Sequence, residues 1–258
     1  MSDRAAPSDL LKRLRGRLRP AFERTVADPT APVGIDLHSD APTLLVAFGG
    51  IQGGIGMPPF EFFRITSTIR TKRLFLRDLR QAWYHEGLPG YASTFTELAA
   101  ALSHMAGQHR FDRLVATGVS AGGYAALAFG TLLGADRVLA FSPQTVITLD
   151  AMWTMGDHRF DKQLVGLAAR KTLDPQWADL RAALPSARCV DTLYELHFDP
   201  ESQLDRAHAE RLAGLEGVHL VTHPGIGHNI PRALRASGEL RPLLTSALRA
   251  GHAANAPN

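Results

Sequence analysis

The chain has 258 residues, of which 45% are hydrophobic and 21% charged, values that are ordinary for a soluble globular protein and fit one large α/β domain or two small ones. Its single cysteine, Cys189, excludes an internal disulfide framework, so a reducing, cytoplasmic setting is expected. The net charge of +3 is small and no clustered basic patch follows the first segment, so nucleic acid is not an expected partner.

The two ends of the chain differ from the segments between them. Residues 1–30 predict a basic amphipathic helix, interrupted near Pro20, and residues 251–258 a flexible tail. Such a helix either packs its leucine stripe on the domain, the more common arrangement, or makes a weak contact with a membrane surface or an anionic partner. It is not a secretory signal, because a continuous apolar segment is missing. No apolar run approaches the roughly 20 residues that span a bilayer.

Short β-like runs then alternate with helical ones. Strands are expected at Pro32–Ser39, Thr43–Gly50, Arg73–Asp78, Asp112–Gly118, Asp136–Pro143, within Ala187–Phe198, and at Gly217–His223. Helices are expected at 93–107, 121–133, 204–215 and 231–250, the last as one helix or a pair. This alternation predicts crossover connections and therefore a single α/β domain around a doubly wound, mostly parallel sheet.

Residues 142–186 break the alternation. They hold Met152, Trp153, Met155 and Trp177 in helical patches, without a clear strand. We interpret this segment as a small cap or irregular insertion over one edge of the sheet.

Ser120 lies between glycines where an expected strand meets an expected helix. The sequence "GVSAG", residues 118–122, matches the G-x-S-x-G nucleophile elbow, in which the residues two before and two after the serine approach closely and must lack bulk. A serine that merely fills a tight turn is the alternative. The spacing does not match the G-x-G-x-x-G dinucleotide loop, and the G-K-[ST] of a phosphate-binding loop is missing.

A serine hydroxyl needs a base to become a nucleophile. His228 follows a loop after the last expected strand, in "VTHPGIGHNI", and we interpret it as that base. His223 is the competitor, but it stands at the strand end and is expected to lie too low to reach Ser120.

The histidine in turn needs a carboxylate that fixes its tautomer. Asp199 directly follows an apolar run at the carboxyl end of the sheet, whereas Asp205 lies just before the expected helix and could equally be its N-cap. The spacing does not decide between them. Loop position slightly favours Asp199, with Asp205 close behind and Glu201 third.

With serine, acid and histidine in this order, the sequence resembles the α/β-hydrolase superfamily from Thr43 to its end. The resemblance implies a Ser–His–acid triad and an oxyanion loop at Phe48–Gly54, although Phe48 stands where the family's HGGG-type motif has histidine. No organic cofactor is implied, and no His, Cys or Asp cluster has the spacing of metal ligands. The backbone amides expected around the oxyanion are those of Ala121, Gly50, Ile51 and Gln52.

Two further segments are similar to a group of bacterial α/β-hydrolase-like proteins associated with polysaccharide or glycan biosynthesis. One spans residues 62–90 and the other is "GADRVLAFSPQT". The similarity implies that Arg77-Asp78 and Trp83-Tyr84 line or brace the pocket. The alternative is that Arg77 and Asp78 form a structural ion pair and that Trp83 belongs to the core.

The sequence therefore predicts a serine hydrolase that cleaves an ester or thioester of a small molecule or glycan through an acyl-enzyme. One alternative is an acyltransferase on the same triad, for example one that moves acetyl groups to or from a glycan. Another is a non-catalytic scaffold that keeps the fold and binds a glycan or protein.

Overall fold

The computed structural model describes residue 28 and residues 30–51, 62–187 and 191–249. The expected amphipathic helix therefore lies almost wholly outside the described residues, as do the expected tail and Gln52.

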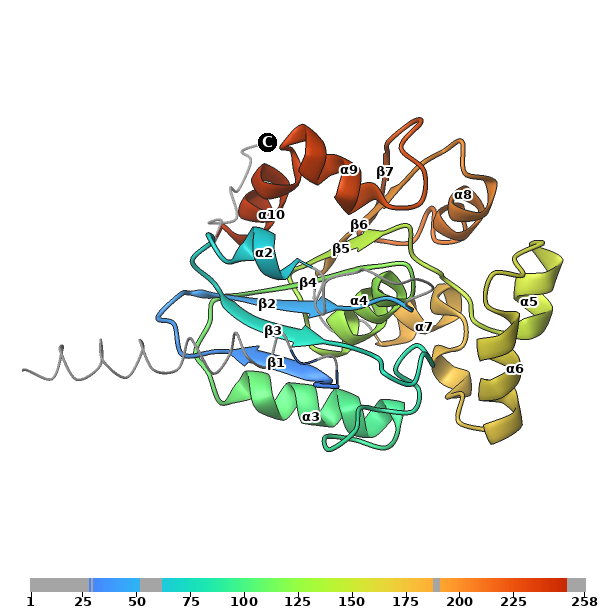
Figure 1. The fold of residues 1–258 in the computed structure, drawn as a ribbon, viewed down its shortest axis with the longest axis horizontal. Helices are drawn as coiled ribbons and strands as arrows, with labels where there is room; N and C mark the ends of the chain where they lie inside the picture. The colour runs from blue at the N-terminus through green and yellow to red at the C-terminus, as the bar shows by residue number, and fades with distance from the viewer. Residues whose placement is uncertain (1–27, 29, 52–61, 188–190, 250–258) are drawn as a thin grey trace, which may run out of the picture.

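A seven-stranded sheet forms the centre of the molecule (Figure 1), with the strand order β1-β3-β2-β4-β5-β6-β7. The first pair, β1 with β3, is antiparallel, and every other neighbouring pair is parallel. The predicted doubly wound, mostly parallel sheet is thus confirmed. The strands are β1 (Val33–Asp36), β2 (Thr43–Phe48), β3 (Lys72–Leu76), β4 (Arg113–Val119), β5 (Arg137–Phe141), β6 (Leu193–Phe198) and β7 (Val218–Thr222).

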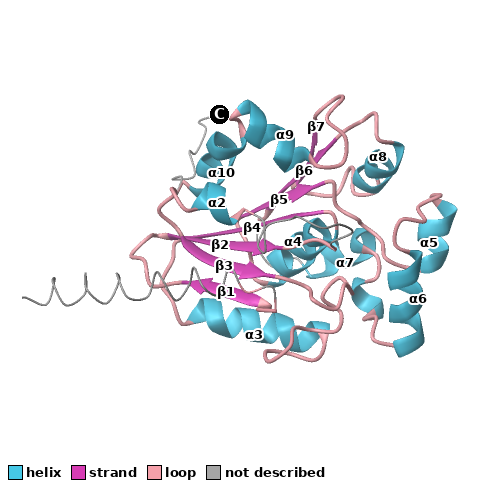
Figure 2. Ribbon diagram, in the orientation of Figure 1, coloured by secondary structure: helices cyan, strands magenta, loops and turns pink. Residues whose placement is uncertain are grey.

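Helices cover both faces of the sheet (Figure 2). One face packs against α3, α4, α7 and α8, and the other against α2, α9 and α10. The helical segments are α2 (Phe63–Thr66), α3 (Phe95–Gly107), α4 (Ala121–Leu132), α5 (Leu149–Thr154), α6 (Asp161–Arg170), the 3₁₀ turn η1 (Pro175–Trp177), α7 (Leu180–Ala187), α8 (Gln203–Glu210), α9 (Ile230–Ser237) and α10 (Leu240–Leu248).

Strand β2 shows why this sequence forms a sheet that is buried on both faces. All of its residues are buried. Leu44, Val46 and Phe48 belong to the core on the α4 side, whereas Leu45 and Ala47 belong to the core on the α10 side. Because successive strand side chains point to opposite faces, a continuous apolar run fills both cores at once.

Residues 142–186 hold α5, α6, η1 and most of α7, and no strand, as the sequence indicates. Helix α7 packs against α4 and supplies the crossover between β5 and β6. The part that departs from regular alternation is therefore the stretch before α7, in which α5 and α6 stand beyond the sheet in Figure 1. Of the helices that the structure describes, none has both the length and the hydropathy needed to cross a membrane.

Candidate active site

Ser120 stands on a strained turn between β4 and α4. Its φ of 57° and ψ of −119° lie where residues other than glycine are rare. A Cβ atom on Gly118 would lie 2.1 Å from the carbonyl oxygen of Gly122, and one on Gly122 would lie 2.3 Å from that of Phe48. Both glycines are therefore sterically required, and the serine side chain is held at the carboxyl edge of the sheet.

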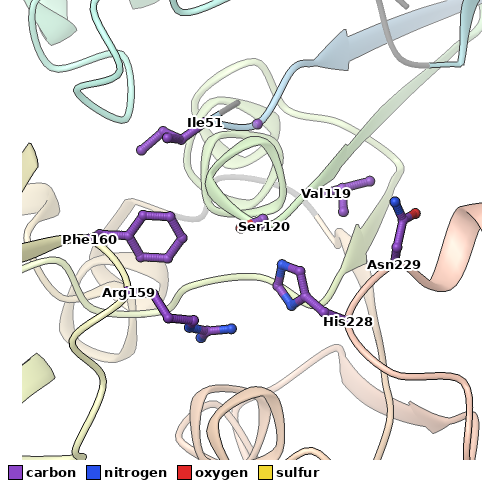
Figure 3. A pocket seen from close by; sticks show the side chains of 8 residues that line it. Ile51, Val119, Ser120, Arg159, Phe160, His228 and Asn229 are labelled. Carbon is purple, nitrogen blue, oxygen red and sulfur yellow. The ribbon is translucent and has the colours of Figure 1, made fainter. Parts of the chain in front are cut away.

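Ser120 lines a pocket of about 330 Å³ (Figure 3). The pocket brings together residues from four separate loops and turns. They are Gly50, Ile51, Val119, Ser120, Arg159, Phe160, His228 and Asn229. Ile51, Val119 and Phe160 give the pocket apolar lining, and the imidazole of His228 and the guanidinium of Arg159 give it polar groups.

The expected oxyanion loop reaches this pocket through Gly50 and Ile51. Gly50 lies so close to the elbow that a Cβ atom there would meet the carbonyl oxygen of Val119 at 2.8 Å. Ala121 is the first residue of α4, so its N–H belongs to the positive end of that helix. These residues therefore lie around the serine, and the fourth expected donor, Gln52, lies outside the described residues.

His228 is paired with Asp205. Its Nδ1 lies 2.9 Å from Oδ1 and 2.8 Å from Oδ2 of the aspartate, which is only 1% exposed. A carboxylate only accepts hydrogen bonds, so Nδ1 carries the proton and Nε2 is left with its lone pair. Figure 3 shows the ring between its own loop and Ser120.

Asp205 also belongs to a buried charge network. Arg159 donates from Nη1 to Asp205 Oδ1 at 3.0 Å, and from Nε and Nη2 to the two oxygens of Asp157 at 2.9 and 2.7 Å. Asp157 further accepts from Nε2 of His208 at 3.2 Å. One guanidinium thus joins two His–Asp pairs.

For each of the two carboxylates, burial and hydrogen bonding act on the pKa in opposite directions. Burial alone would raise the pKa of Asp205, but the hydrogen bond and charge of His228, followed by those of Arg159, leave it below its ordinary value. Burial would likewise raise the pKa of Asp157, yet the hydrogen bonds from His208 and Arg159 hold it far lower. Both residues are therefore carboxylates at neutral pH.

Asp199 forms no hydrogen bond with the imidazole of His228, whose Nδ1 is bonded to Asp205. Its carboxylate accepts the backbone N–H groups of Gly225, Gly227 and Glu201. These hydrogen bonds lower the pKa of Asp199, and the bond from Gly227 has the largest effect. This geometry reverses the order in which the sequence ranks the carboxylates: Asp199 holds the loop after β7, which presents His228, and Glu201 is exposed on the loop after β6.

The sequence also places Asp205 slightly wrongly. Helix α8 begins at Gln203 with Ser202 as its N-cap residue, so Asp205 lies within the first turn rather than before it. A signal for its role is present, because Asp205, His208 and Ala209 are spaced as one buried face of a helix.

His223 lies apart from the pocket. Its Nε2 is 3.0 Å from Nδ1 of His197, and their rings stack. Burial, and then the charge of His197, lower the pKa of His223. His223 does not line the pocket that holds Ser120.

Of the residues singled out at 77–84, Tyr84 and Trp83 contact residues at the site, whereas Arg77 and Asp78 bond elsewhere. The Tyr84 hydroxyl donates to the carbonyl oxygen of Gly49 at 2.9 Å and so fixes the start of the oxyanion loop. Asp78 accepts backbone N–H groups from its own loop, including that of Tyr84, while Arg77 donates to the carbonyl oxygen of Asp28. Trp83 is fully buried, as the core alternative predicts, and its ring meets that of Phe160 edge-on.

The sequence gives no warning of Arg159, Asp157 or His208, which belong to no recognisable motif. Gln144 lies in the segment "GADRVLAFSPQT", but the resemblance assigns it no role. It is fully buried and donates from Nε2 to Ser120 Oγ at 2.9 Å. Among the described side chains, no three His, Cys, Asp or Glu gather in a way that could hold a metal ion.

No protein-family model and no curated protein sequence matches the chain. Several solved structures resemble it. The fluorophosphonate-binding serine hydrolase FphF of Staphylococcus aureus has a TM-score of 0.56 at 13% identity, with 82% of this chain and 85% of that one covered. Brefeldin A esterase, a bacterial homologue of human hormone-sensitive lipase, has a TM-score of 0.52 at 17% identity, with 96% and 88% covered.

The capsule O-acetyltransferase of Neisseria meningitidis serogroup A is similar to the same degree, with a TM-score of 0.56 at 12% identity and 84% and 90% of the chains covered. At such identities the likeness concerns the fold. Together with the observed strand order, these similarities show that the chain has the fold of the α/β-hydrolase superfamily.

Proposed function

We propose that this protein is a serine hydrolase that cleaves an ester or thioester through Ser120, His228 and Asp205. One observation carries the proposal: a serine on a strained elbow lines the same pocket as a histidine whose Nδ1 is bonded to a buried carboxylate. The hydrolase fold supports it.

In the first half of the reaction, Ser120 Oγ attacks the carbonyl carbon of the substrate. Its proton passes to Nε2 of His228 as the Oγ–C bond forms, and the π electrons of the carbonyl move to its oxygen. Asp205 stabilises the imidazolium that results. The tetrahedral species then collapses, expelling the alcohol or thiol, which takes the proton from His228.

Backbone amides bind the negative oxygen in both halves. We assign this role to the N–H of Ala121 together with those of Gly50 and Ile51, because these residues surround Ser120. One such donor typically contributes about 3–4 kcal/mol to stabilisation of the transition state.

In the second half, water replaces the alcohol. His228 takes a proton from the water as its oxygen bonds to the acyl carbon, and the collapse that follows breaks the Oγ–C bond. Ser120 recovers its proton from His228, and the free acid leaves. The apolar side chains of Ile51, Val119 and Phe160 suit a short apolar acyl chain, because pockets of this kind bind ligands through apolar contact.

Fluorophosphonate labelling and ester turnover test this proposal. The wild-type protein is expected to react, and Ser120→Ala to lose both reactivities while keeping its melting temperature. Equal labelling of the two proteins would remove Ser120 from the mechanism. A wild-type protein that does not react at all would favour a binding scaffold instead.

Acyl transfer is the second candidate. The shared fold of the capsule O-acetyltransferase favours it, since that enzyme carries an acyl group to an acceptor hydroxyl on the same architecture. The site is the same, with a sugar hydroxyl in place of water. The two functions are distinguished by how the acyl group partitions between water and an added sugar. Acylated sugar at a millimolar concentration of the acceptor indicates a transferase, and free acid alone indicates a hydrolase.

A further inference from the structure

Gln144 contacts the reacting oxygen of Ser120. Its side chain is fully buried, and its Nε2 lies 2.9 Å from Ser120 Oγ. Both residues are described, as is His228, and no hydrogen bond joins the serine to that histidine in this state. Among the described residues, Gln144 is thus the polar side chain that bonds to the nucleophile.

The orientation of the Gln144 amide follows from its other partner. Its Oε1 lies 3.3 Å from Nε1 of Trp83. An indole N–H can only donate, so the amide oxygen must face Trp83 and the amide NH₂ must face Ser120. Ser120 Oγ therefore accepts this hydrogen bond, and its own proton is free to point elsewhere.

The backbone fixes Gln144 from both sides. Strand β5 ends at Phe141, and Ser142 follows with a φ of 43°, a left-handed conformation that is costly for serine. Pro143 then packs against Gly123, where a Cβ atom would lie 3.0 Å from the ring. On the other side, the Thr145 N–H donates to Nδ1 of His208 at 3.1 Å.

We propose, building on the hydrolase function above, that Gln144 is a further catalytic residue. By donating to Ser120 Oγ, its amide N–H leaves the hydroxyl proton to His228 and stabilises the charge that Oγ gains as that proton departs. In deacylation the Oγ–C bond breaks and its electron pair stays on Oγ. The same N–H then donates to Oγ and stabilises that negative charge. Gln144 itself gains and loses no proton in either half.

Two substitutions separate the donor from the shape of the side chain. Gln144→Met keeps the length and removes the donor; we expect labelling by a fluorophosphonate and ester turnover to fall about 10- to 100-fold, somewhat less than for an oxyanion donor. Gln144→Glu keeps the shape and replaces the donor by an acceptor, which competes with His228 for the proton. In this variant, labelling and ester turnover at neutral pH are expected to fall more than about 100-fold.

Trp83→Phe tests the same contact without altering Gln144. It removes the donor that orients the amide, and a loss of several-fold in the labelling rate is expected. Gln163→Met is the matched control, because Gln163 donates a hydrogen bond from its side-chain amide to Oε1 of Gln81 and does not line the pocket. It is expected to react like the wild type.

The outcomes separate this inference from the proposed function. If the wild type and Gln144→Met are labelled at the same rate, the role of Gln144 is overturned while the hydrolase stands. If the wild type is not labelled, both the hydrolase function and the role of Gln144 are overturned. A slow Gln144→Met with a normal Gln163→Met, at equal melting temperatures, supports the assignment.

Discussion

The molecule holds two His–Asp pairs that share one arginine but differ in their surroundings. In the first, His228 faces the pocket with a side chain that is 39% exposed, and none of the described residues forms a hydrogen bond with its Nε2. In the second, His208 is fully buried, and its Nδ1 already accepts a backbone N–H from Thr145.

The difference shows what turns an imidazole into a base. The backbone N–H fixes His208 as a neutral ring that donates to Asp157, so no lone pair is left for a substrate. His228 uses its Nδ1 on Asp205 and keeps the other nitrogen for chemistry. We infer that the buried pair anchors Arg159, and that the exposed pair takes part in the reaction.

Replacement of each histidine by alanine gives the sharpest contrast. His228→Ala is expected to lower ester turnover at least about 10⁴-fold with an unchanged melting temperature, because a triad without its base keeps little activity. His208→Ala is expected to lower the free energy of unfolding by about 2–3 kcal/mol, since it leaves a cavity and a buried carboxylate with one partner fewer. Its turnover per folded molecule stays within about 10-fold of the wild type. The reverse pattern would exchange the roles of the two pairs.

The carboxylates extend the comparison. Asp205→Asn is expected to reduce turnover by about 10³- to 10⁴-fold, because an amide at this place allows the wrong histidine tautomer. Asp199→Asn disturbs only the loop that carries His228, so it is expected to reduce turnover far less, by about 10-fold. Steady-state kinetics on the two variants measure the difference, and a larger loss for Asp199→Asn would restore it as the triad acid.

Arg159 joins the pairs, and its removal tests the link. In Arg159→Met the guanidinium that donates to both Asp205 and Asp157 is lost, so the carboxylate that orients His228 keeps one partner fewer. Turnover at neutral pH is expected to fall about 10-fold in steady-state kinetics, because the imidazole is then held less firmly. Arg206→Met, which breaks an exposed pair on α8, the helix that carries Asp205, is the control and is expected to react like the wild type. Equal turnover of Arg159→Met and the wild type would mean that Arg159 does not act on the triad.

The smallest effect concerns stability in acid. The folded-state pKa of Asp157 is depressed below its ordinary value of 3.8, so its contribution is present above that pH and is lost as the pH falls through the lower folded value. Asp157→Asn is expected to be less stable at pH 7 by about 2 kcal/mol and to lose less stability on acidification. Urea unfolding at pH 7 and pH 3 measures this, and parallel losses in both proteins would contradict it.

Much of this architecture follows from local sequence. Apolar runs and turn residues specify all seven strands, and the glycines at 118 and 122 specify the elbow, because the steric demand is local. The choice between Asp199 and Asp205 was not specified, since it depends on where each side chain points after folding. Gln144 lies 24 residues from Ser120, and Arg159 lies 46 from Asp205, so tertiary structure alone makes those contacts.

A crystal structure of the protein after reaction with a fluorophosphonate tests the central claim most directly. We expect phosphorus on Ser120 Oγ, a phosphonyl oxygen within hydrogen-bonding distance of the Ala121 N–H, and His228 still paired with Asp205. An unmodified Ser120, or a phosphonate bound elsewhere on the chain, would contradict it.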